Sequence, residues 1–217
     1  MNFIFLFLVS TALGSFTHAC AVRYTPSLPG KLSCCDYCHH PLPWKDKLPI
    51  LSFTLLKGRC RYCHTPLDLS LLVFELISPL FAFILYSNGY SILFYFAFLT
   101  LLYAAKVDWS YHFIPDRCHF LLALFAIPLL PNDILYHLIL ASLYPLALLP
   151  FAHHQKIGWG DIKLLFSLGF FTGFTLLVNL IIVSCTAALY HSFFKLKQPI
   201  PFAPYLLFGF VFCIMIT

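Results

Sequence analysis

Acidic side chains are scarce in this sequence, because only eight aspartates and glutamates occur among its 217 residues. Charged residues make up 10% of the chain, hydrophobic residues make up 61%, and the mean hydropathy is +0.88. One soluble core of this length cannot bury so much apolar surface, so the composition excludes a soluble globular protein and predicts an integral membrane protein. An acid placed near the membrane in such a chain is a candidate for function.

Long apolar stretches recur along the chain, and a helical span needs about 20 mostly apolar residues. The predicted spans cover residues 2–20, 69–87, 90–107, 118–130, 133–151, 162–173, 174–193 and 203–217. The first stretch lacks the basic start and the small-residue cleavage site of a signal peptide, so we expect it to remain as a helix. The predicted fold is an all-α polytopic membrane protein with about eight transmembrane helices.

Basic residues are absent from every second connection between these spans. All 13 lie on the other connections or beside them: Arg23, Lys31, Lys45, Lys47, Lys57, Arg59, Arg61, Lys106, Arg117, Lys156, Lys163, Lys195 and Lys197. Because lysine and arginine mark cytoplasmic loops, this pattern predicts cytoplasmic basic loops and both termini outside. Membrane topology thus accounts for the net charge of +5, and we predict no nucleic-acid partner.

The first helix, assigned to residues 1–22, is followed by a polar loop predicted as a small domain over residues 23–68. Within it, Cys35-Asp36-Tyr37-Cys38-His39-His40-Pro41-Leu42 returns as Cys60-Arg61-Tyr62-Cys63-His64-Thr65-Pro66-Leu67. The Cys-x-x-Cys spacing lets two thiolates from one turn bind one tetrahedral metal ion. We therefore predict a structural zinc ion held by Cys35, Cys38, Cys60 and Cys63.

Other ligand sets remain open at this point. Cys34 can replace Cys35, and the neighbouring histidines His39, His40 and His64 can also serve as ligands. A disulfide framework is disfavoured because the loop is assigned to the reducing cytosol. A thioredoxin-like redox site needs a single such motif in an α/β setting, whereas this loop has two.

The stretch from Ile157 to Lys163 has two glycines, Gly158 and Gly160, before Asp161, so the backbone there can approach other groups closely. Asp108 and Asp161 each lie where a predicted span meets the cytoplasmic face. Two carboxylates that converge share a proton, so one can accept a proton from water while the other donates one to a carbonyl oxygen. The predicted chemistry is attack of water on an amide bond without a covalent intermediate.

Each acid also has a structural interpretation. Asp108 can be a charge at a helix end, and Asp161 can be the N-cap of its helix. We interpret Asp116 and Asp133 as helix caps. Glu75, two turns into the second span, is either a packing residue or a substrate contact, because a buried glutamate there must face other helices or water.

Five features carry a resemblance to the type IV prepilin peptidases. They are Gly14-Ser15-Phe16, the two cysteine motifs, Asp108 through Ile114-Pro115-Asp116, Gly158-Trp159-Gly160-Asp161 with Lys163-Leu164, and Ile200-Pro201-Phe202. Their order along nearly the whole chain is that of the family, whereas a Gly-x-Gly-Asp motif alone is shared with other intramembrane aspartyl proteases. Ala203 departs from the glycine that usually follows this phenylalanine.

The resemblance implies an aspartic endopeptidase of the bacterial inner membrane that removes the basic leader of prepilins or pseudopilins at the cytoplasmic face. It makes Asp108 and Asp161 the catalytic pair of a membrane-embedded domain over residues 69–217. Many members also methylate the new amino terminus, which implies S-adenosylmethionine as a cofactor. A competence pilus or a secretion pseudopilus is the implied setting.

Two other classes of protein compete with this interpretation. An ion-coupled transporter would use Asp108 and Asp161 as relay acids, but the sequence shows no internal transmembrane repeat. A docking module on an inert membrane anchor would use the cysteine loop, but it leaves the placement of the acids unexplained. The sequence makes no prediction about the oligomeric state.

Overall fold

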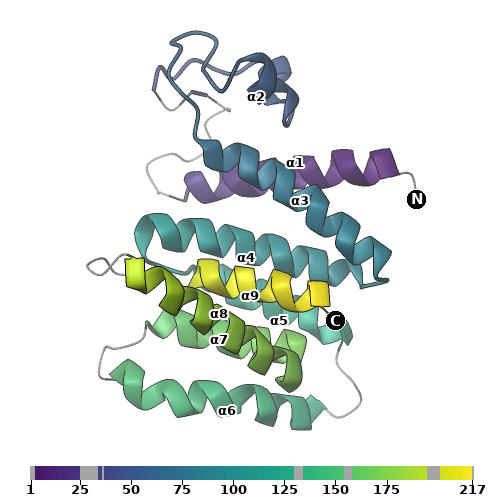
Figure 1. Cartoon of the computed structure of the whole chain (residues 1–217), viewed down its shortest axis with the longest axis vertical. Coiled ribbons are helices and arrows are strands. Elements are labelled where there is room, and N and C mark those ends of the chain that lie inside the picture. Colours follow the sequence, from purple (N-terminus) through teal and green to yellow (C-terminus); the bar gives the residue numbers. More distant parts are fainter. Residues whose placement is uncertain are drawn as a thin grey trace. The chain divides into compact units, whose positions relative to one another are not determined.

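The computed structural model describes residues 3–24, 34–35, 37–129, 134–153, 158–194 and 201–216 (Figure 1). The predictions made above for Asp36, Asp133, Ile157, Ile200, Lys31, Lys156, Lys195 and Lys197 lie outside the described residues. Across these described ranges the regular secondary structure is helical, with two isolated β-bridges and no strand, so the all-α prediction is confirmed there. The chain divides into two compact units, Met1–Tyr90 and Ser91–Thr217.

In the first unit, α1 (Phe3–Val22) packs against α3 (Leu69–Ser87), and the short helices η1 (Trp44–Lys47) and α2 (Leu51–Leu55) lie between them in the sequence. Small residues bring the two long helices together. A Cβ atom on Gly14 would lie 2.6 Å from the Phe74 carbonyl oxygen. The Ser78 hydroxyl donates to the Ser10 carbonyl oxygen at 2.7 Å. Such close contact is how apolar helices associate in a membrane.

The second unit is a bundle built around α4. Its elements are α4 (Ile92–Tyr111), α5 (Asp116–Ala126), η2 (Ile127–Leu129), α6 (Ile134–His153), α7 (Trp159–Thr172), α8 (Phe174–Phe194) and α9 (Ala203–Ile216). Helix α4 packs against α5 and α9, while α7 contacts α5, α6 and α8. Ala97, Phe98 and Leu101 of α4 are fully buried. Packing therefore fixes the positions of the last turn of α4 and the first turn of α7.

Within the described residues each predicted span overlaps a helix, with residues 118–130 divided between α5 and η2, but this overlap does not confirm eight membrane spans. Among the described residues, four helices are long and apolar enough to cross a membrane, namely α1, α3, α4 and α8. The third span was predicted to end at residue 107, but α4 continues to Tyr111 and ends at His112, which has φ 52°. Asp108 consequently lies inside the last turn of α4 instead of just beyond the helix.

Candidate active site and metal centre

Asp108 is a buried carboxylate held by the start of another helix. Its side chain comes from the last turn of α4, and the residue is 6% exposed. The Ala203 backbone N–H, at the first residue of α9, donates to Asp108 Oδ2 at 3.0 Å. The Phe202 backbone N–H is a further hydrogen-bond donor to this carboxylate. The helix dipole also favours negative charge at this end of α9, so these donors offset part of the cost of burying the Asp108 carboxylate.

Asp161 is the third residue of α7, and it is a partly exposed residue. Gly158 is the N-cap residue, so Asp161 itself is not the N-cap. The Gly158 backbone N–H instead bonds to the Asp161 carboxylate. This is the return bond of a capping box, in which an acid in the first turn satisfies the N–H of the cap residue.

The two glycines before Asp161 serve different purposes. A Cβ atom on Gly158 would lie 3.1 Å from Asp161 Oδ2, so glycine leaves room for the carboxylate to fold back on the backbone. A Cβ atom on Gly160 would lie 3.3 Å from the Ile114 Cβ atom. Gly160 therefore lets the first turn of α7 approach the segment that links α4 to α5.

Asp108 lies in the last turn of α4 and Asp161 in the first turn of α7, near enough for their carboxylates to repel each other electrostatically. Two nearby carboxylates cannot both ionise without cost, so one of them tends to keep its proton. One member of such a pair can take a proton from water while the other protonates a carbonyl oxygen. This is the chemistry that the sequence predicts for Asp108 and Asp161.

Asp116 was predicted to cap its helix, and this prediction is wrong. Pro115 is the N-cap residue of α5, and no side chain caps this helix. The Asp116 carboxylate accepts a hydrogen bond from Lys163 Nζ at 2.8 Å instead, and both side chains are exposed.

Sequence reasoning also missed His119, whose two ring nitrogens are buried without a hydrogen-bond partner in the structure as described. Its ring interacts electrostatically with Asp116 and Lys163.

The four predicted cysteine ligands form one cluster. The Sγ atoms of Cys35, Cys38, Cys60 and Cys63 all lie within 4.8 Å of one another. Cys35 Sγ and Cys63 Sγ are 3.7 Å apart. Tetrahedral zinc with Zn–S bonds of about 2.3 Å requires sulfur atoms about 3.8 Å apart. The donor set and its spacing therefore fit a tetrahedral metal ion.

The sequence repeat folds as a structural repeat. The Cys35 N–H donates to the His40 carbonyl at 3.0 Å, and the Cys60 N–H donates to the Thr65 carbonyl at 2.9 Å. His39 and His64 occupy equivalent left-handed positions, with φ 56° and 57°. Each turn thus points its two thiols toward one centre, and the local Cys-x-x-Cys spacing is sufficient to specify this geometry.

The alternative ligands lie outside the cluster. Cys34 forms an isolated bridge with Pro41 and is not one of the four clustered cysteines. None of the three histidines considered as ligands belongs to the cluster either. The Thr65 hydroxyl lies 3.0 Å from Cys63 Sγ. The side-chain hydrogen bond from Thr65 lowers the pKa of the Cys63 thiol to about 6, which favours the thiolate form that binds metals.

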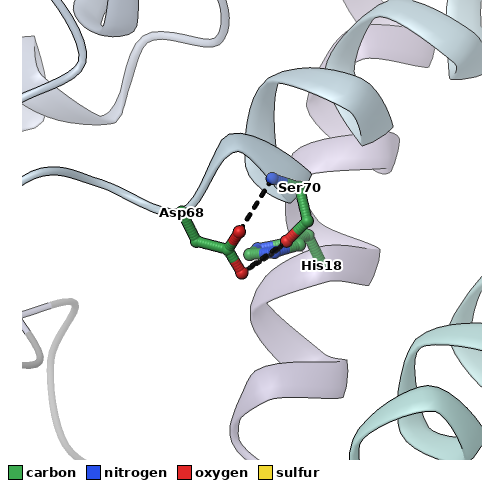
Figure 2. A network of polar contacts seen from close by, with 3 residues as sticks. All are labelled: His18, Asp68 and Ser70. Carbon is green, nitrogen blue, oxygen red and sulfur yellow. Dashed lines mark hydrogen bonds and ion pairs between the residues drawn. The ribbon is translucent and has the colours of Figure 1, made fainter.

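A serine, a histidine and an aspartate meet where α1 and α3 pack together (Figure 2). His18 Nε2 lies 2.7 Å from Ser70 Oγ. The Ser70 hydroxyl donates to Asp68 Oδ2 at 2.6 Å, and the Ser70 N–H donates to Asp68 Oδ1 at 2.9 Å. In a catalytic triad the serine hydroxyl donates to the histidine, and the acid bonds to the opposite ring nitrogen. Here the hydroxyl donates to the acid, so the network caps α3 and joins it to α1.

Glu75 links the cysteine loop to a membrane helix. The residue is 3% exposed within α3. Its Oε2 atom accepts a hydrogen bond from the Ile50 backbone N–H at 2.6 Å. Ile50 precedes α2 and has φ 61°, an uncommon conformation for a β-branched residue. Of the two interpretations of Glu75, these contacts support the structural one.

Together these features define a class of protein. It is a helical membrane protein with a pair of neighbouring carboxylates and a four-cysteine cluster. The model of the bacterial Peptidase A24 N-terminal domain matches residues 8–88, and that of the type IV leader peptidase family matches residues 92–193. The prepilin leader peptidase/N-methyltransferase of Bacillus subtilis is 32% identical, and the match covers 92% of this chain and 88% of the relative.

More distant relatives carry the same name. The protein from Vibrio cholerae is 26% identical, and the match covers 97% of this chain and 96% of the relative. The protein from Burkholderia pseudomallei is also 26% identical, and the match covers 86% of this chain and 67% of the relative. No solved structure gives a significant match. This chain belongs to the type IV leader peptidase family, and the resemblance seen in the sequence is confirmed.

Proposed function

We propose that this protein is a prepilin leader peptidase, an aspartic endopeptidase whose catalytic pair is Asp108 and Asp161. The observation that carries the proposal is the placement of the two acids in a chain of this family: Asp108 ends α4, and Asp161 begins α7, where Gly160 packs against Ile114 just beyond α4. A transporter would also use paired acids, but neither family model nor any relative cited above is a transporter.

The surroundings of the two carboxylates support different roles. Asp108, with backbone donors from the start of α9, acts as the base that takes a proton from the attacking water. Asp161 keeps its proton in the resting enzyme and donates it to the oxygen of the scissile carbonyl. Water thereby adds to the carbonyl carbon and gives a gem-diol. The proton on Asp108 then passes to the leaving amine, Asp161 regains a proton from a diol hydroxyl, and the C–N bond breaks.

The proposed substrates are prepilins or pseudopilins, as the names of the relatives suggest. The apolar helix of such a substrate would lie in the bilayer, while its leader would reach the carboxylates at the interface. We place the protein in the bacterial inner membrane with about eight spans and its active site facing the cytoplasm. The four apolar helices described above support the membrane location.

Residues 23–68 are proposed to form a module that binds a structural zinc ion through Cys35, Cys38, Cys60 and Cys63, and residues 69–217 to form the peptidase domain. A bound zinc ion would fix both cysteine turns relative to each other. The name N-methyltransferase in the relatives supports a second activity, for which S-adenosylmethionine would supply the methyl group.

Co-expression with a prepilin substrate tests the catalytic pair. Asp108→Asn and Asp161→Asn should each accumulate uncleaved precursor, because neither amide can carry out the proton transfers of the acid that it replaces. Asp116→Asn is the matched control, since this exposed acid pairs with Lys163 and an exposed ion pair contributes at most about 1 kcal/mol. Mass spectrometry of the substrate amino terminus reports both cleavage and an added methyl group. Normal cleavage by Asp108→Asn or by Asp161→Asn would refute the proposed catalytic pair.

A further inference from the structure

Exposed apolar side chains gather on the loop between α1 and α3. Leu51 and Leu55 lie four residues apart on α2 and therefore on the same face, and they are 58% and 80% exposed. Trp44 in η1 is 69% exposed. We call these three residues the apolar edge. Large apolar side chains that gather on a surface indicate a binding site for a partner or a membrane.

Exposed positive charges accompany the apolar edge. Lys45, Lys47 and Lys57 are exposed. The acid within this stretch, Asp46, has a side chain only 2% exposed and is paired with Arg61 at 2.7 Å. Lysines next to tryptophan and leucine are typical of segments that lie in the headgroup layer of anionic membranes. Tryptophan is itself enriched at this layer.

The contact with Glu75 fixes the level of the apolar edge along α3. Glu75 follows the first residue of α3, Leu69, by six positions, which corresponds to about 9 Å along a helix. Because Glu75 bonds to the Ile50 N–H, α2 begins beside the first two turns of α3 and not beyond its end. Helix α3 is apolar enough to cross a membrane. Helix α2 therefore lies at the level where α3 enters the bilayer.

We infer that Trp44, Leu51 and Leu55 insert into the headgroup layer of the bilayer and that Lys45, Lys47 and Lys57 bind anionic phospholipids there. A basic leader peptide is a poorer occupant, because it carries the same charge as these lysines. The inference depends on the membrane location of α3 and not on the peptidase activity. If the protein fails to cleave prepilins, its lipid contacts can still be tested, and if the lipid contacts are absent, cleavage can still be tested.

Photo-crosslinking of the full-length protein tests this inference. The photoreactive residue p-benzoylphenylalanine replaces Leu55, and in a control variant it replaces Tyr37, which lies on the first cysteine turn and is 76% exposed. Both variants are placed in nanodiscs of phosphatidylcholine and phosphatidylglycerol and irradiated. Leu55 should give phospholipid adducts by mass spectrometry, and Tyr37 should give none. Adducts to residues 91–217 or to a second copy in place of lipid, or equal lipid adducts at both positions, would overturn the inference.

Phospholipid selectivity tests the role of the lysines. At position 55, phosphatidylglycerol adducts should exceed the bulk fraction of that lipid roughly twofold or more, since basic residues near the membrane surface attract anionic lipid. Lys45→Gln, Lys47→Gln and Lys57→Gln together should return the ratio to the bulk value while adducts still form. An unchanged ratio would contradict the lysine contacts.

Tryptophan fluorescence provides a measurement that leaves Leu55 unchanged. Brominated phospholipids quench only nearby rings, so the difference between wild type and Trp44→Phe isolates Trp44 from the other two tryptophans. We expect this difference signal to be quenched strongly by bromine close to the headgroups. A Trp44 signal that brominated lipid leaves unchanged would overturn the insertion of Trp44.

Discussion

At the level of single residues, the sequence indicated the acids of the proposed site but not the groups that contact them. Asp108 and Asp161 could be selected because acids are scarce and because glycines precede Asp161. Ala203 could not be selected, since a backbone N–H has no sequence signature and its partner lies 95 positions away. The Asp116–Lys163 pair was missed for the same reason, because its members are 47 positions apart.

The role of the Ala203 N–H can be tested without changing either proposed catalytic acid. Ala203→Pro removes this donor at the first position of α9, where proline suits a helix. Ala203→Gly keeps it and restores the residue usual in the family. A hydrogen bond to a charged group contributes about 1.5–3 kcal/mol, which corresponds to a loss of roughly 10- to 100-fold in kcat for the proline variant. Initial cleavage rates in reconstituted vesicles measure this loss in kcat.

Folding must be separated from catalysis in this comparison, because Ala203 is fully buried. Thermal unfolding in detergent should show that both variants are folded at the assay temperature. The glycine variant should cleave within a few-fold of wild type. Equal rates for the two folded variants would show that the donor does not matter.

At the level of elements, apolar length predicted the long helices and local spacing predicted the cysteine turns. Both features are local, so the sequence alone contains them. The short helices η1 and α2 were not predicted, because four or five residues show no periodicity. The end of α4 was also missed, because the helix continues past residue 107 and ends only at His112, which has a left-handed conformation.

The cysteine turns make a prediction about metal content. Cys60→Ser removes a buried member of the cluster and should lower bound zinc from about one ion per chain to near zero. Its thermal unfolding should also occur at lower temperature, because metal binding contributes to folding. Cys34→Ser is the matched control and should retain the ion, since Cys34 lies outside the cluster. Elemental analysis of the purified proteins measures it, and equal zinc in both variants would exclude a four-cysteine site.

At the level of the whole molecule, the distribution of basic residues predicts an orientation. Alkaline phosphatase fused after Gly89 should be active, because that turn is predicted outside the cytoplasm, where the enzyme folds. The same enzyme fused after Asp68 should be inactive, because the cysteine loop is predicted inside. Phosphatase activity in intact cells, divided by the amount of fusion protein, shows on which side of the membrane each fusion point lies. Reversed activities would invert the topology and place the proposed active site on the wrong face for a basic leader.

The hydrogen bond between Asp108 and the start of α9 also has a consequence for biosynthesis. Because α9 follows α4 by 91 residues, from Tyr111 to Phe202, the ribosome completes the acid-bearing helices well before this donor. A partly synthesised chain already contains both carboxylates but lacks the N–H that holds Asp108 in place. Full proteolytic activity would then arise only when α9 inserts, so incomplete chains in the membrane would cleave substrate more slowly than the finished protein.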